Sequence, residues 1–380
     1  SFRILFHVYH LNIYNYKGTE TIMSKSKTLI IFTILIQLSW AGITFSGNAA
    51  LRPRFDHKTF GDYPKDGILN SSGDSYILYR GRIRMIADIG EGWFFNAKLS
   101  TNAPANYNRL GKGDKLDDSN PDGSGRSSIY FMEMFWGYHK KNTGAWVGII
   151  PVNGINNPGL DIHYYPKLMV NIPWVLYNNN ATTGFGGYYV FNNEKINWTL
   201  SIDNDVTNYE EPVGSDKISR LDNITVMVDY QFHFDDFSVK PIMLLTIADD
   251  DEATPTTAGV QVKIPGISKF SLSGNAYFTS QSNSDAPDGK YEGWLVRGKA
   301  SRKIGKGTLT FWLDVAEMDW DMEDTHTFTF FWGHYLIPVY SSDFGSVTVR
   351  PTFRYLNEAV DGIMDVSLYR FEITTEIKFK

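Results

Sequence analysis

Apolar and polar residues alternate along almost the whole chain after residue 75, and the alternating segments are long. In 224–234, Ile, Val, Tyr and Phe alternate with Thr, Asp, Gln and His, and the same period of two runs through 76–90, 93–100 and 347–355. A period of two indicates strands rather than helices. Soluble strands most often have about 5–6 residues, whereas a strand tilted across a membrane needs about 9–11. These segments reach about 9–14 residues, so the sequence predicts an all-β fold with strands able to cross a bilayer.

The connections between these strands alternate strictly in length. Short connections are expected at 90–92, 139–144, 192–195, 235–236, 265–268, 302–307 and 338–345. Long polar connections are expected at 56–75, 102–126, 153–184, 204–219, 248–257, 280–289, 317–325 and 356–362. Transmembrane antiparallel up-and-down β-barrels join their strands in this way, with short turns on one side and long loops on the other. With a first strand near 49–55 and a last at 363–379, the pattern predicts a barrel of about 16 strands, within a range of 14–18 because two more fit at 168–177.

The N-terminal region has the pattern of an export signal. Lys25 and Lys27 follow Met23, an apolar stretch covers 28–40, and small residues follow it. A single membrane anchor is the alternative, but it needs about 20 apolar residues and Gln37 interrupts this stretch. The expected division is therefore 1–22 as an upstream segment, 23–46 as a signal peptide and 47–380 as the barrel.

Composition excludes several classes of function. The absence of cysteine removes disulfides, thiolate metal sites and cysteine nucleophiles together. The chain has 36 Lys+Arg and 42 Asp+Glu; four of the basic and one of the acidic residues precede residue 47, which leaves a net charge of −9 for 47–380. Because this balance is acidic, binding of nucleic acid through a basic surface is not expected.

The last strand carries a more specific signal. Tyr369, Phe371, Ile373, Ile377 and Phe379 share one face, which resembles the C-terminal signal of outer-membrane barrels, although Lys380 follows the final aromatic residue. Across about 48–380 the chain resembles a Gram-negative porin or porin-like outer-membrane channel, and its arginine-lined strands resemble alginate-export barrels. This resemblance implies an outer-membrane location, contact with lipid, assembly by the barrel-assembly machinery through the last strand, and passage of small hydrophilic solutes. It also allows a homotrimer and implies no cofactor.

If the apolar faces meet lipid, the polar faces line the lumen. Arg80, Arg82 and Arg84 then form a ladder with steps of about 6–7 Å along one strand. Two interpretations stay open: the ladder creates a field that selects anionic solutes or sugar acids, or it pairs with lumen carboxylates to hold the barrel's shape. The further lumen candidates are Lys98, Glu133, Arg297, Arg350 and Arg354.

The third long connection, 153–184, is expected to fold inward and narrow the channel. Its candidate binding residues are Asp161, His163, Tyr165 and Lys167. The alternative is that its apolar run, 168–177, forms two additional strands.

Two carboxylate clusters are weaker candidates. The segment 118–123 resembles the start of a calcium loop, but its twelfth position is Ile129 instead of glutamate. Glu317 and Asp319 resemble the carboxylates of a jelly-roll glycosidase, which leaves a secreted or barrel-embedded hydrolase as an alternative function. A plugged structural barrel is another. Neither a metal site nor catalysis is expected.

Aromatic residues near strand ends are expected to form two girdles at the membrane interfaces, because amphipathic rings favour the headgroup level. The candidates are Trp136, Tyr138, Trp146, Tyr188, Trp198, Trp294, Trp332 and Tyr335.

Overall fold

A computed structural model describes most of the chain from Gly42 onward. The described residues are 42–60, 71–101, 107–110, 129–151, 181–192, 194–202, 223–234, 237–248, 254–267, 269–282, 290–320, 325–360 and 364–380. Among them no helix is long and apolar enough to cross a membrane. Residues 1–41 of the predicted upstream segment (1–22) and signal peptide (23–46) lie outside the described residues, and that division stays a prediction.

The unit Thr44–Lys380 is built of antiparallel strands. Their bounds are β1 Ile43–Phe60, β2 Ser71–Gly90, β3 Trp93–Ser100, β4 Asn108–Arg109, β5 Tyr130–His139, β6 Thr143–Pro151, β7 Ala181–Phe191, β8 Glu194–Ser201, β9 Asn223–Phe234, β10 Phe237–Ala248, β11 Thr256–Ile267, β12 Phe270–Gln281, β13 Tyr291–Ile304, β14 Gly307–Trp320, β15 His326–Ser342, β16 Gly345–Val360 and β17 Met364–Phe379.

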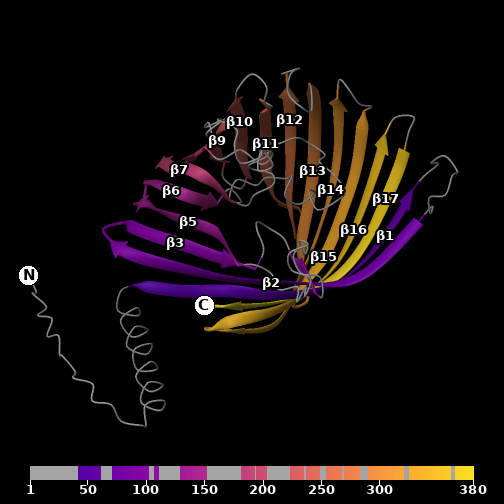
Figure 1. Cartoon of the computed structure of the whole chain (residues 1–380), viewed down its shortest axis with the longest axis horizontal. Coiled ribbons are helices and arrows are strands. Elements are labelled where there is room, and N and C mark those ends of the chain that lie inside the picture. Colours follow the sequence, from indigo (N-terminus) through magenta and orange to yellow (C-terminus); the bar gives the residue numbers. More distant parts are fainter. Residues whose placement is uncertain are drawn as a thin grey trace, which may run out of the picture. The chain divides into compact units, whose positions relative to one another are not determined.

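The strands close into a barrel because the first strand pairs with both the last and the second. β1 pairs with β17 from Gly47 opposite Phe379 to Phe60 opposite Val366, and it also pairs with β2. The first and last strands lie side by side in Figure 1. β4 is only two residues long and extends the edge of β3 along β2. The other 16 strands form the closed antiparallel barrel, which confirms the predicted fold class and strand number.

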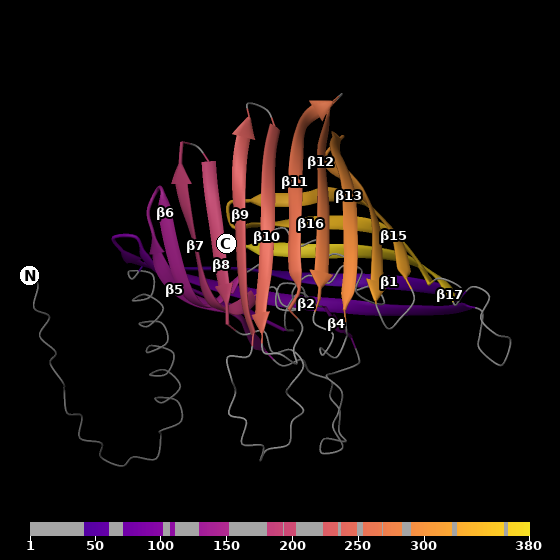
Figure 2. The ribbon, with the colours of Figure 1, turned by 90° about the horizontal axis from the view of Figure 1, so that it is seen from above.

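The alternation of short and long connections is also confirmed. Six hairpins leave two residues between their strands, and β5 and β6 are separated by three; Figure 2 shows the up-and-down course of β9 to β13. At the β2–β3 hairpin, Glu91 and Gly92 have φ values of 55° and 92°, as a tight hairpin with the twist of its strands requires. The first strand differs from the prediction: β1 has 18 residues and begins at Ile43, inside the segment expected as a leader.

The two faces of the strands differ in the way predicted for a barrel in lipid. Ile83, Val296 and Phe353 lie on the outer face and are 49%, 50% and 42% exposed, whereas Thr225 and Asp229 point inward and are buried. An apolar outer face and a polar inner face are the reverse of a soluble core and the rule for transmembrane barrels.

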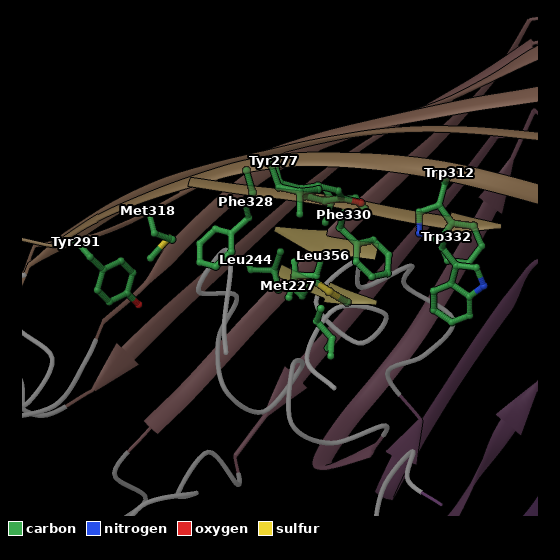
Figure 3. Packing of buried hydrophobic residues seen from close by; sticks show 14 residues of the cluster. Met227, Leu244, Tyr277, Tyr291, Trp312, Met318, Phe328, Phe330, Trp332 and Leu356 are labelled. Atoms are coloured by element: carbon green, nitrogen blue, oxygen red, sulfur yellow. The ribbon is translucent and has the colours of Figure 1, made fainter. Parts of the chain in front are cut away.

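The inner face is not polar throughout. From β13 to β16, Leu295, Met318, Phe330 and Leu356 point inward and are buried, in a cluster that Figure 3 shows. The cluster also contains Trp332, whose ring lies 4.3 Å from that of Trp312. Trp332 therefore belongs to the interior and not to a girdle, because its strand position has the inward parity.

The remaining girdle candidates divide by the same parity. Trp136 and Trp198 lie on the outer face and are exposed, as expected for a girdle. Trp146 and Tyr188 share the inner face with Ile150 and Thr182, and their rings lie 6.0 Å apart, so the girdle prediction is wrong for them.

Candidate functional site

Four neighbouring strands from the two ends of the chain carry a dense set of inward arginines. We call this surface, on β16, β17, β1 and β2, the arginine wall. Its members occupy alternate positions on their strands, so the period of two places all of them on the lumen face. They are Arg52, Arg54, Arg80, Arg82, Arg84, Arg350, Arg354 and Arg370.

Glu372 lies at the centre of the wall and is fully buried. Arg354 Nη2 donates to its Oε1 at 2.6 Å, and Arg54 donates to its Oε2 through Nε at 2.9 Å and Nη2 at 2.8 Å. Arg52 lies 3.7 Å from Oε1 and donates to Thr374 at 2.8 Å. One carboxylate therefore contacts three guanidinium groups from two neighbouring strands, β1 and β16, and the charge it contacts exceeds its own.

A second ion pair closes the wall on its loop side. Arg370 donates to both oxygens of Asp56, at 2.6 and 2.7 Å, in the bidentate geometry that fixes a guanidinium against a carboxylate. The Tyr76 hydroxyl donates to the same carboxylate at 2.7 Å. Residues 314 positions apart in the chain thus join β1 to β17.

The predicted ladder on β2 is present, and carboxylates contact Arg80 and Arg84. Arg80 lies 3.3 Å from Glu376. Arg84 contacts Glu133 at 2.7 Å, and Lys98 contacts the other oxygen of Glu133 at 2.6 Å. Glu133 on β5 is buried. Through these two contacts it links β5 to β2 and β3, next to the arginine wall.

Aromatic rings lie against three of the arginines. The Arg52 and Arg80 guanidinium groups lie 3.7 and 4.5 Å from the centre of the Tyr107 ring, and that of Arg354 lies 3.4 Å from Trp332. The negative face of an aromatic ring attracts a guanidinium group that lies over it, so these contacts stabilise the positions of the three arginines. Tyr107 belongs to the second long connection, which the sequence did not single out as a lumen element.

Arg297 is separate from the wall. It forms a bidentate pair with Asp314 on the neighbouring strand, with both distances 2.6 Å, and both side chains are buried. The structure therefore brings together seven of the predicted lumen residues and leaves Arg297 on another part of the barrel. The seven are Arg80, Arg82, Arg84, Lys98, Glu133, Arg350 and Arg354.

Other predicted residues fall elsewhere. Asp161, His163, Tyr165 and Lys167, with the whole predicted constriction in 153–180, lie outside the described residues, as does the calcium-like segment 118–123. Within the described part of the chain no cluster of three or more metal-ligating side chains occurs.

The two carboxylates considered for hydrolysis do not point into the lumen. Glu317 and Asp319 occupy outward positions near the loop end of β14, where Glu317 accepts from the Trp294 indole at 3.4 Å and Asp319 accepts from Thr325 at 3.2 Å. The barrel also differs from a jelly-roll sandwich, so the hydrolase alternative is not favoured.

A closed antiparallel barrel of 16 strands, apolar outside and charged inside, has the porin-like fold of outer-membrane β-barrels. Solved structures agree. OmpT of Vibrio cholerae, expressed in the outer membrane, matches with a TM-score of 0.54 and 9% identity over 89% of this chain and 97% of that protein. The anion-selective porin of Comamonas acidovorans matches with a TM-score of 0.52 and 11% identity over 88% and 99%. The likeness is one of fold. No family model and no curated protein sequence matches the chain.

Proposed function

We propose that the protein is an outer-membrane channel through which small hydrophilic solutes diffuse passively, with a preference for anions. The observation that carries the proposal is the surplus of cations on the arginine wall. Within the described part of the chain, eight arginines and Lys98 line this face, and ion pairs join several of them to Asp56, Glu133, Glu372 and Glu376.

The protein wall has a low dielectric constant and screens these charges less than water does, so their electric field reaches into the lumen. Fixed charges of one sign in a narrow aqueous path raise the local concentration of counter-ions and lower their barrier. The two interpretations of the ladder are then compatible: the ion pairs keep the guanidinium groups in place, and the positive balance of the wall attracts anions.

A transverse field between opposite charges receives no support. The strands eight places further round the barrel are β8 to β11. Their inward Asp229 accepts from Asn197 at 2.8 Å, and inward lysines, Lys195 and Lys240, lie on the neighbouring strands. Because that side also carries lysines, anion attraction is the better description of the lumen.

The outer face supports the membrane part of the proposal. Apolar side chains from every part of the closed sheet are exposed there, and a bilayer is the solvent that accepts such a surface. Assembly through β17 and a homotrimeric state remain predictions; one similar structure, OmpT of Vibrio cholerae, is described as a trimer form.

The test is the reversal potential of purified barrels in planar bilayers under a KCl gradient. We expect chloride preference in the wild type. Replacing Arg80, Arg82 and Arg84 by serine removes three wall cations, so the reversal potential moves toward cation preference while conductance persists.

A matched control removes three cations from one exposed hairpin end. Arg302 and Lys303 lie near the end of β13, and Lys306 lies in the β13–β14 turn. Lys303 and Lys306 are exposed and Arg302 is half-buried, and charges in open solvent are screened within about 10 Å at 0.1 M salt. Their replacement by serine changes the net charge equally but leaves the potential near the wild-type value. Equal shifts in both variants would refute the role of the wall.

A plugged structural barrel is the second candidate, favoured by one observation: inward apolar residues such as Leu295, Phe330 and Leu356 are fully buried. It predicts folded, detergent-soluble protein that inserts into bilayers without opening pores, which the same experiment detects.

A further inference from the structure

Tyr107 reaches the arginine wall from outside the four strands that form it. Directly after this residue, Asn108 and Arg109 of β4 pair with β2. The Asn108 side-chain amide donates to the Thr101 carbonyl at 2.7 Å, and the Leu110 backbone N–H donates to a carbonyl of β2 at 2.7 Å. These contacts fix the chain next to Tyr107 against the edge of β2.

The ring of Tyr107 lies across the inner face of β2. β4 runs along the edge of β2 that is opposite β1. The ring centre nevertheless lies 4.5 Å from the guanidinium carbon of Arg80 on β2 and 3.7 Å from that of Arg52 on β1. Neighbouring strands are about 4.8 Å apart, so a side chain that starts beside β2 reaches Arg52 only over the lumen face of β2. Both arginines lie about halfway along their strands, so the ring lies near mid-height of the barrel.

The exposure of the arginines differs between the part of the wall under the ring and the part nearer the turns. The side chains of Arg52 and Arg80 are 8% and 14% exposed, whereas that of Arg84, nearer the turn on the strand of Arg80, is 39% exposed. All three contact a carboxylate, so ion pairing does not account for the difference, and the position of the ring does. Tyr107 therefore covers Arg52 and Arg80 and leaves Arg84 open to the lumen.

The ring also restricts what the two covered arginines can bind. A guanidinium group binds a carboxylate through paired N–H donors in its own plane, whereas a chloride ion needs only a positive field. Under the ring, Arg52 donates to Thr374 at 2.8 Å and Arg80 donates to Glu376 at 3.3 Å. Both arginines thus keep their charge in the wall while their donors are directed at β17.

Building on the channel function proposed above, we propose that Tyr107 is a specificity-determining residue of the lumen, which favours small inorganic anions over organic carboxylates. The ring leaves the field of the wall in place for chloride. It also prevents Arg52 and Arg80 from forming paired hydrogen bonds with a solute carboxylate. Without the ring, these long side chains regain rotamer freedom and can turn their donors toward such a solute.

The experiment measures reversal potentials of barrels in planar bilayers, with chloride on one side and gluconate on the other. Tyr107→Ala should raise the gluconate-to-chloride permeability ratio about threefold, the effect expected from the loss of one cation–π contact. Tyr107→Phe retains the ring and should restore the wild-type ratio. A wild-type ratio in Tyr107→Ala, or an equal rise in Tyr107→Phe, would overturn the proposal.

A second pair of ions separates this effect from simple widening of the path. N-methylglucamine is a cation of about the size of gluconate, and its permeability relative to potassium should be the same in the wild type and in Tyr107→Ala. An equal rise for both organic ions would mean that the ring only narrows the lumen, and the proposed discrimination would be wrong. If Tyr107→Ala does not fold, Tyr107→Leu, which keeps apolar bulk without a ring face, takes its place with the same expectations.

Tyr188→Ala is the matched control. Tyr188 also points inward, and its ring centre lies 4.5 Å from the Lys195 ammonium nitrogen, but it belongs to β7, outside the arginine wall. Its removal should leave the gluconate-to-chloride ratio at the wild-type value. An equal rise in this variant and in Tyr107→Ala would reflect a general loosening of the barrel and would refute the role of Tyr107.

Failure of this inference is distinguishable from failure of the channel function. Chloride-selective pores whose permeability ratio does not respond to Tyr107→Ala would leave the channel function in place and remove the inference. Wild-type barrels that insert into bilayers without opening pores would refute both.

Discussion

The arginine wall and the group of short strands from β5 to β8, here called the short-stranded wall, differ in what fills the inner face of the barrel. The four strands of the arginine wall have 16, 16, 18 and 20 residues, and charged networks fill their inner face. The short-stranded wall has strands of 10, 9, 11 and 8 residues. Glycines occupy much of its inner face, and the Trp146 ring covers Gly186. A barrel of one topology thus holds one side by ion pairs and another by close backbone and ring packing.

The largest effect expected from this contrast is the loss of Glu372. Glu372→Gln leaves Arg52, Arg54 and Arg354 without the carboxylate that they share, and breaking a buried ion pair costs about 3–5 kcal/mol. Urea unfolding of folded barrels in detergent, followed by tryptophan emission, should show this loss in the free energy of unfolding.

Asp343→Asn is the control for that substitution, because Asp343 is exposed in the β15–β16 turn. Its unfolding curve should overlay that of the wild type. A similar overlay for Glu372→Gln would mean that the arginine wall does not stabilise the barrel through this carboxylate.

On the short-stranded wall, by contrast, adding a methyl group at an inward glycine should destabilise the barrel. Gly148 has φ +130°, and a Cβ there would lie 2.3 Å from the Met134 carbonyl oxygen. Gly148→Ala should therefore lower the free energy of unfolding by about 1–3 kcal/mol. Gly298→Ala on β13, where a Cβ would meet nothing within 4 Å, should be neutral or slightly stabilising in the same assay. If the two substitutions behave alike, close backbone packing is not what holds this wall.

Much of the fold followed from the sequence because period and loop length are local signals. Alternation fixed which residues of β2, β9 and β16 face outward, and the connection lengths gave the strand number. The ladder Arg80–Arg82–Arg84 was visible for the same reason. Arg52 and Arg54 on β1 show the same spacing of two, but the sequence predicts only a short strand there, near 49–55, and a short strand does not distinguish them as lumen residues.

The partners of the ladder were beyond local signals. Glu372 meets Arg52 across a pairing of the first and last strands, 320 positions apart, and no spacing rule contains such a register. The same holds for Tyr107, which reaches two arginines of different strands. The girdle prediction is wrong for Trp146 and Trp332 because their positions in the period of two place them on the inner face, although their residue type suits a membrane interface.

The smallest expected effect is a change in tryptophan fluorescence. It compares Trp136, on the outer face of the short-stranded wall, with Trp332, on the inner face beside the arginine wall. Trp136 on β5 is 51% exposed on the outer face, whereas Trp332 on β15 is 8% exposed and stacks under Arg354. In vesicles of brominated lipid, a bromine atom quenches only rings that touch the acyl chains. Trp136→Phe should remove one lipid-facing tryptophan from the quenchable emission, and Trp332→Phe should leave the quenchable part unchanged while lowering the rest. If Trp332→Phe reduced quenching as much as Trp136→Phe, the indole would face lipid, and the inward parity assigned to β15, with the stacking that orients Arg354, would be wrong.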